Sequence, residues 1–123
     1  MQFVHTTQAP QAIGPYSQAV VHNGLVYTSG QIALTPQGEM VENDLEAQTH
    51  QVLKNLGEVL KAAGSDYDKV LKTTIFLADM ESFAQVNTIY ASYFGAHKPA
   101  RSTVAVKTLP KNALVEIDAI AVV

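Results

Sequence analysis

Arg101 opens the alternating run PARSTVAV, residues 99–106, and its type and setting point to chemistry. The alternation is typical of a strand, so Arg101 and Thr103 share one face while Ser102 and Val104 share the other. This run alone leaves two interpretations of the guanidinium open. It is a solvent-facing charge at the start of a strand, or it anchors an anionic ligand.

Glu116 is a carboxylate inside the last, almost entirely apolar run, LVEIDAIAVV, residues 114–123. A carboxylate in such a strand must be paired, face a solvated cleft, or have a raised pKa. The alternative is that Glu116 and Asp118 form the wet face of an edge strand. Leu114, Ile120 and Val122 share the parity of Glu116 and argue against a wet face.

Three further positions each have a structural and a functional interpretation. Asn87 falls on the apolar stripe of a predicted helix, either as a hydrogen-bonded core residue or as a site residue. Tyr16 follows the rigid pair Gly14-Pro15 and either packs its own loop or faces a ligand. Gly30, in the run TSGQI, ends a strand where a ligand or chain approaches closely, or forms a plain turn.

Composition and spacing exclude several kinds of site. The chain has no cysteine, which removes thiolate nucleophiles, disulfides and Cys-ligated metals. Its four histidines have no metal-binding spacing, so no metal is expected. The absence of Gly-rich phosphate loops and of a G-x-S-x-G elbow predicts no nucleotide cofactor and no serine nucleophile.

Length, charge and hydropathy indicate a single domain, residues 1–123. Eight Lys and Arg against eleven Asp and Glu give a net charge of −3. The chain lacks the basic stripe that a nucleic-acid backbone requires, so no nucleic acid is expected as a partner. No apolar run approaches the ~18 residues of a membrane span, and the first residues do not predict a secretion signal. We therefore expect a cytoplasmic protein without a membrane partner.

The elements that position these residues follow from periodicity, turn residues and helix caps, and their order is βββαβαββ. Asp44 and Asp79 are the expected N-caps of two helices, which lie between residues 44 and 64 and between 79 and 95. The expected strands are 2–6, two arms of a hairpin within 18–32 that turns at Asn23-Gly24, then 69–78, 101–109 and 113–123.

The second helix carries the stripe Phe83, Asn87, Tyr90 and Phe94. Two helices that join strands through crossovers place both on one face of a mixed sheet. The other face then lacks a cover, while the last strand, apolar at both parities, is expected to be buried on both sides. A homo-oligomer that packs sheets together is the simplest way to cover that face.

Read together, these stretches resemble the RidA (YjgF) family of enamine and imine deaminases. The resemblance lies in AIGPYSQAV, VYTSGQI, TIFLADMESFAQVNTIYASYF, PARSTVAV and LPKNALVEIDAIAV, in the family's order and spacing and over nearly the whole chain. It implies a chorismate-mutase-like α+β fold. It also implies a homotrimer with sheets packed inward, helices outside and active sites in clefts between neighbouring subunits.

The resemblance further implies roles for individual residues. Arg101 corresponds to the family's carboxylate-binding arginine, whose two parallel N–H donors fit a planar carboxylate as lysine cannot. Glu116 corresponds to the glutamate that holds or activates water, and Tyr16 to the tyrosine that closes the pocket. The implied substrate-binding positions are Ser29, Gly30 through its backbone, Asn87 and Thr103.

Thr103 departs from the family, because many members have cysteine at this position. The family role of the position is mainly a backbone contact, so hydrolysis is expected to be intact. Thiol-dependent or redox-switched activity is not expected, since the chain has no thiol.

The implied activity is hydrolytic deamination of 2-aminoacrylate and 2-aminocrotonate, as their imine tautomers, to 2-oxo acids and ammonia, without a cofactor. The implied ligand is thus a small 2-imino or 2-oxo carboxylate. Two alternatives remain: a non-catalytic regulatory protein that senses small carboxylates, and, disfavoured by the acidic balance, a ribonuclease or translation inhibitor. The residues do not tell which imine is preferred or whether a partner protein is regulated.

Overall fold

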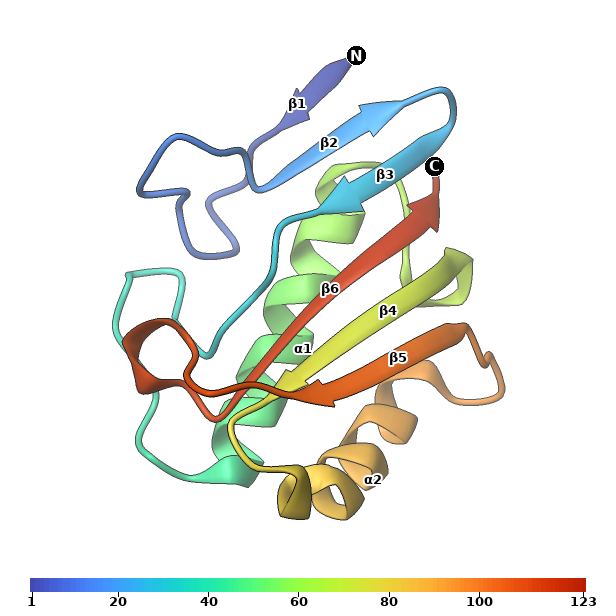
Figure 1. Cartoon of the computed structure of the whole chain (residues 1–123). Helices are drawn as coiled ribbons and strands as arrows, with labels where there is room; N and C mark the ends of the chain where they lie inside the picture. The colour runs from blue at the N-terminus through green and yellow to red at the C-terminus, as the bar shows by residue number, and fades with distance from the viewer.

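Residues 1–123 form two helices and a six-stranded mixed sheet in the computed structural model (Figure 1). The predicted α+β class and element order, βββαβαββ, are confirmed. The elements are β1 (Gln2–Val4), β2 (Ala19–His22), β3 (Leu25–Thr28), α1 (Leu45–Ala62), β4 (Val70–Leu77), α2 (Phe83–Phe94), β5 (Ala100–Ala105) and β6 (Val115–Val122).

The sheet has the strand order β1-β2-β3-β6-β4-β5. Only β4 and β5 are parallel, because α2 carries the chain back between them, and all other neighbouring strands are antiparallel. Both helices lie behind the sheet in Figure 1, as predicted, and leave its other face open. β1 and β5 are the two edge strands.

Turn and cap residues form two of the connections that the sequence predicts. Asn23 and Gly24 have φ angles of 51° and 78°, the two left-handed conformations of a type I′ hairpin turn. The Asp44 side chain accepts a 2.8 Å hydrogen bond from the backbone N–H of Ala47 and so begins α1. Gly64, with a φ of 86°, follows the end of that helix.

Several element ends differ from the prediction, among them that of β1, which ends at Val4 rather than at residue 6. Asp79 caps a single 3-10 turn, Met80–Ser82, so that α2 itself begins at Phe83. β5 ends at Ala105 rather than at residue 109, because its neighbour β4 ends opposite it at Leu77. A strand continues only as far as a neighbour offers it hydrogen bonds, and sequence alternation does not report that limit.

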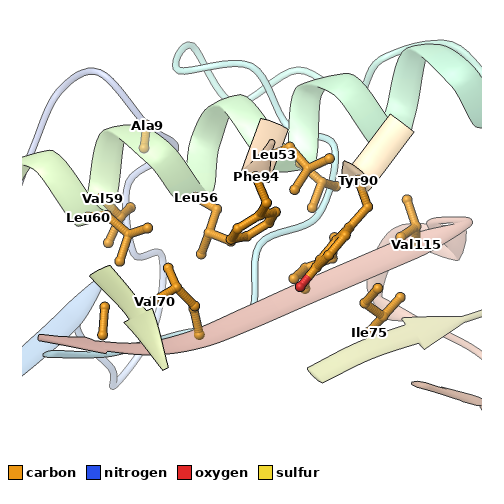
Figure 2. Packing of buried hydrophobic residues seen from close by; sticks show 14 of the residues in the cluster. Ala9, Leu53, Leu56, Val59, Leu60, Val70, Ile75, Tyr90, Phe94 and Val115 are labelled. Carbon is orange, nitrogen blue, oxygen red and sulfur yellow. The ribbon is translucent and has the colours of Figure 1, made fainter. Parts of the chain in front are cut away.

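The hydrophobic core lies between the helices and the sheet. One cluster of 20 buried hydrophobic residues joins α1, α2 and the inner face of the sheet. Figure 2 shows Leu53 and Leu56 of α1, Tyr90 and Phe94 of α2, and Ile75 of β4 in the same interior. Burial of apolar surface, at roughly 25 cal/mol per Å², holds both helices on this face.

The opposite face of the sheet is not covered by this chain. Along β6, Ile117 and Ala119 are buried, whereas Glu116 and Ile120, which point the other way, are half-buried. A cross-strand row of apolar side chains, from Phe3 on β1 to Ile120 on β6, crosses this open face. Within this chain β6 is therefore buried on one side only, and the expected cover of its second side by a homo-oligomer stays a prediction.

Candidate functional site

Three loops meet at one end of the strands and enclose a cavity of about 510 Å³, the Glu116 cavity. In Figure 1 they lie together on the left: the loops that follow β1 and β3 and the loop that precedes β6. Four predicted site residues line this cavity, namely Tyr16, Ser29, Gly30 and Glu116. The fold thus gathers around Glu116 residues that are far apart in the sequence.

Glu116 reaches this cavity from the open face of the sheet. It pairs with Phe76 of β4, so both side chains project from that face. Burial raises the pKa of the Glu116 carboxyl, and the nearby charge of Asp118 raises it further. A carboxylate with a raised pKa is a stronger proton acceptor than an ordinary glutamate.

Gly30 lies directly against the Glu116 carboxyl group. A Cβ atom at position 30 would stand 2.8 Å from Cδ of Glu116, closer than side chains pack. Gly30 is exposed, and neither its N–H nor its carbonyl forms a hydrogen bond within the chain. A side chain at position 30 would therefore force the Glu116 carboxyl group to move, and the backbone groups of Gly30 are available at the cavity wall.

Ser29 holds the loop that carries Tyr16. Its hydroxyl donates a 2.5 Å hydrogen bond to the carbonyl of Ser17, and its backbone N–H donates to the carbonyl of Gln18 at 2.9 Å. The hydroxyl proton of Ser29 is thus used within the chain, and only its oxygen lone pairs remain for a ligand. Tyr16 itself is 54% exposed at the rim of the cavity.

Gln18, which the sequence analysis missed, fixes the loop that lines the Glu116 cavity. Its buried amide accepts a 2.7 Å hydrogen bond from Thr6 N–H and donates to the carbonyls of Thr6 and Pro10 at 3.0 and 2.8 Å. These bonds fold the loop that forms one wall of the Glu116 cavity. A glutamine beside a strand carries no sequence signal for this role, because its partners lie eight to twelve residues away.

Arg101 and Asn87 line a second cavity, of about 430 Å³, between the end of α2 and the start of β5. Nη1 of Arg101 donates a 2.7 Å hydrogen bond to Oδ1 of Asn87. The guanidinium carbon lies 5.0 Å from the centre of the Tyr90 ring and 5.3 Å from that of Phe83. Lys98 also lines this Arg101 cavity and no carboxylate does, so its charge suits an anion.

Tyr90 and Phe83 were predicted only as part of an apolar stripe. Their spacing with Asn87, at i, i+4 and i+7, was the available signal that one helix face meets Arg101. Periodicity alone does not separate a core stripe from a stripe that also contacts a charged group.

Thr103 lines neither of these cavities. It pairs with Ile75 of β4 and, as predicted from strand parity, has the orientation of Arg101. Its hydroxyl oxygen is buried and has no hydrogen-bond partner within the chain. Of the seven predicted site residues, Thr103 is the only one that lines neither the Glu116 cavity nor the Arg101 cavity.

Arg101 and Glu116 do not share a cavity in one chain. Arg101 pairs with Thr73, which in turn pairs with the buried Ala119, so its side chain leaves the sheet on the helix side. Glu116 projects with Phe76 from the open side. The two groups best suited to bind a carboxylate and to move a proton are therefore separated by the sheet.

Two further features bear on the kind of site. The structure contains no group of three or more His, Cys, Asp or Glu side chains placed to hold a metal ion. Neither helix is long and apolar enough to cross a membrane.

Comparison with known sequences gives a consistent set of relatives. The profile of the family described as Endoribonuclease L-PSP matches residues 6–123. Reactive Intermediate Deaminase A, chloroplastic, of Arabidopsis thaliana is 55% identical over 98% of this chain, and the chain spans 65% of that protein's length. The 2-iminobutanoate/2-iminopropanoate deaminase of Mus musculus is 52% identical over 97% of this chain and 89% of its own.

A solved structure extends the similarity to three dimensions. E. coli TdcF with bound serine superposes with a TM-score of 0.94 at 40% identity, covering 100% of this chain and 99% of that one. TdcF is thus a protein of the same fold that holds a small ligand.

Proposed function

The chain belongs to the Endoribonuclease L-PSP family, whose members include the RidA-type deaminases, and from this we propose that it is a 2-iminobutanoate/2-iminopropanoate deaminase. The observation that carries the proposal is the similarity to the mouse deaminase, at 52% identity over 97% of the chain. In this proposal Arg101 binds the substrate carboxylate and Glu116 transfers the proton.

The proposed reaction converts a 2-imino acid and water to a 2-oxo acid and ammonia. 2-Aminoacrylate and 2-aminocrotonate tautomerise to 2-iminopropanoate and 2-iminobutanoate, whose imine carbon is already electrophilic. Arg101 binds the substrate carboxylate through parallel N–H donors. Glu116 takes a proton from a water molecule as the water oxygen attacks the imine carbon. The nitrogen then gains protons, the C–N bond breaks, and ammonia leaves.

This chemistry needs no cofactor, because the substrate itself provides the electrophile. The protein contributes positioning and proton transfer. The raised pKa of Glu116 supports its role as the base, since a raised pKa makes the carboxylate a stronger proton acceptor. Gly30 contributes free backbone groups beside that carboxyl, and Tyr16 closes the cavity.

The remaining site residues have supporting roles in this proposal. Ser29 holds the Tyr16 loop through Ser17 and offers its oxygen lone pairs. Asn87 orients Arg101. Thr103 contacts the substrate through its backbone, and its unpartnered hydroxyl is free to accept or donate a hydrogen bond when the site is complete.

We further propose a homotrimer in which Arg101 of one subunit faces Glu116 of its neighbour. The support is the placement of the two residues on opposite faces of one sheet, together with the uncovered apolar face. Packing these open faces inward would bury the row from Phe3 to Ile120. The single domain over residues 1–123 and the cytoplasmic location stay predictions.

The direct test generates the enamine in place from serine or threonine with a pyridoxal-phosphate dehydratase and measures ammonia release. We expect the full-length protein to accelerate ammonia and 2-oxo acid formation above the rate of free hydrolysis. No acceleration, combined with retained binding of 2-oxobutanoate, would favour the carboxylate-sensing regulatory alternative. RNA cleavage that weakens steeply with salt would favour the ribonuclease that the family description names.

A further inference from the structure

One face of α2 meets the guanidinium of Arg101 at three points. Phe83, Asn87 and Tyr90 stand at i, i+4 and i+7 and therefore lie on the same side of the helix. Asn87 accepts a 2.7 Å hydrogen bond from Nη1, and the rings of Tyr90 and Phe83 lie 5.0 and 5.3 Å from the guanidinium carbon. We call this set of three side chains the guanidinium platform.

We propose that Phe83 and Tyr90 are positioning residues, whose rings hold the Arg101 guanidinium ready to bind a carboxylate. The inference rests on the proposed function only in naming the ligand class, a 2-imino or 2-oxo acid. It assigns to the apolar stripe of α2 a role in binding beside its role in the core.

The need for a platform follows from the place of Arg101 in the fold. Arg101 is exposed and stands on the edge strand β5, where no further strand restrains it. A free arginine side chain populates many rotamers, and a ligand that fixes it has to overcome part of that entropy. Two ring contacts and one acceptor restrict the guanidinium before any ligand arrives, which makes binding of a planar carboxylate more favourable.

The platform leaves most of the guanidinium free. A guanidinium has five N–H donors in a fixed plane, and Asn87 accepts from one of them. The remaining donors are available for parallel hydrogen bonds to a carboxylate. An ammonium group at position 101 would have no plane for the rings to orient, so the platform matches arginine specifically.

Tyr90 is itself fixed in place. Its hydroxyl shares a 2.8 Å hydrogen bond with the Thr73 hydroxyl in the buried interior, and its ring stacks on Phe94 with centres 4.5 Å apart. Thr73 is also the residue that pairs with Arg101 across β4 and β5. The backbone of Arg101 and the ring beneath its guanidinium are thus tied to the same residue, which keeps their relative position constant.

The sequence allows an unusually clear test, because Arg101 is the only arginine in the chain. Its side-chain Nε–Hε group therefore gives one unambiguous NMR signal, which aromatic rings at this distance shift upfield. We expect Phe83→Leu and Tyr90→Leu each to move that signal toward the position of a free arginine, and Tyr90→Phe, which keeps the ring, to leave it in place. Tyr93→Leu is the matched control, because Tyr93 lies on the same helix but contacts His50 and Tyr67 instead.

Binding of 2-oxobutanoate to the full-length protein, measured by calorimetry, is the second readout. Loss of either ring is expected to weaken binding by about 2- to 5-fold, the range that one cation–π contact supports. In the enamine assay the same variants should raise KM by a similar factor with little change in kcat. Phe83 is half-buried at the helix start, so Phe83→Leu keeps the test valid if Tyr90→Leu, a core change, does not fold.

The outcomes separate this inference from the proposed function. If the wild-type protein releases no ammonia but the ring variants lose affinity for 2-oxobutanoate, the deaminase proposal is wrong and the guanidinium platform is supported. An active protein whose NMR signal, affinity and KM are the same in Phe83→Leu as in the wild type would overturn the platform and leave the deaminase standing. Equal loss of affinity in Tyr93→Leu would also overturn it, because the effect would then be general to the helix.

Discussion

Arg101 and Glu116 lie on opposite faces of the same sheet, one strand apart. β4 lies between their strands, and its residues Thr73 and Phe76 pair with Arg101 and Glu116 respectively. The side chain of Arg101 projects from the face that the helices cover, and that of Glu116 projects from the open face. This separation is the support for our proposal that a complete site combines Arg101 of one subunit with Glu116 of another.

Subunit mixing tests this arrangement. Arg101→Ala and Glu116→Gln are each expected to be inactive alone, because every site then lacks one of the two groups. After random exchange of subunits between the two variants, roughly one quarter of the shared sites regain both native residues. We therefore expect about a quarter of the wild-type ammonia release rate. Mixed oligomers, verified by mass spectrometry, that stay inactive would contradict a site shared between subunits.

Arg101→Lys tests the geometry of the guanidinium separately from its charge. Lysine keeps the positive charge but loses the parallel donors, which are worth ~1.5–3 kcal/mol in charge-assisted hydrogen bonds. We expect kcat/KM on 2-aminoacrylate to fall by about 10- to 100-fold, mainly through KM, with an unchanged thermal unfolding temperature. Lys98→Ala, which removes the other charge in the Arg101 cavity, is the control and is expected to have a smaller effect. Full activity in Arg101→Lys would remove Arg101 from the site.

The parts of the fold that could be predicted from the sequence are those set by neighbouring residues. The Asn23-Gly24 turn and the Asp44 cap depend on backbone geometry within a few residues, so they were predictable. Strand ends depend on non-local pairing, and β5 ends where β4 ends at Leu77. That limit does not appear in the alternation of the strand's own residues.

The sequence singled out six of the residues that line the two cavities but could not predict how they are grouped. Parity correctly gave Arg101 and Thr103 one orientation, because side chains alternate along any strand. It could not relate Arg101 to Glu116, since this requires the register of two strand pairs. Gln18 was missed because its hydrogen-bond partners are defined only once the loop has folded.

Glu116→Gln tests the role of the carboxylate as a base. Glutamine keeps the shape and burial of the side chain but cannot accept the proton of water. We expect kcat to fall on the order of 100-fold or more, while 2-oxobutanoate still binds. In the wild type, kcat should fall as the pH decreases through the raised pKa of Glu116, and this acidic limb should vanish in the variant. Normal hydrolysis by Glu116→Gln would exclude the water-activating role.

The same carboxyl group predicts how stability depends on pH. The pKa of Glu116 in the folded protein lies above 4.5, the ordinary value that applies to the unfolded chain. The folded protein therefore binds the carboxyl proton more tightly than the unfolded chain does. Its stabilising contribution is complete below pH 4.5 and is lost as the pH rises through the folded-state pKa. Glu116→Gln should therefore unfold at a higher temperature than the wild type at pH 7, and the difference should shrink below pH 4.5. A difference that is constant from pH 4 to 8 would contradict the raised pKa.

Gly30→Ala tests the contact between the backbone at position 30 and the Glu116 carboxyl. The φ angle of Gly30 is not in the left-handed region, so alanine meets no backbone strain, and a compatible Gly→Ala change commonly stabilises a protein by about 0.4–1 kcal/mol. The new Cβ would instead collide with Glu116 and displace its carboxyl from the cavity. We expect the change to lower both the free energy of unfolding and kcat.

The sign of the effect depends on Glu116, which makes a double-mutant cycle decisive. In the Glu116→Ala background the collision is absent, so Gly30→Ala should be neutral or stabilising in thermal unfolding, the reverse of its effect in the native background. This reversal would place the collision at the carboxyl group rather than elsewhere on the loop. An equal destabilisation in both backgrounds would mean that the backbone at position 30 requires glycine for another reason, and that Glu116 does not depend on it for its position.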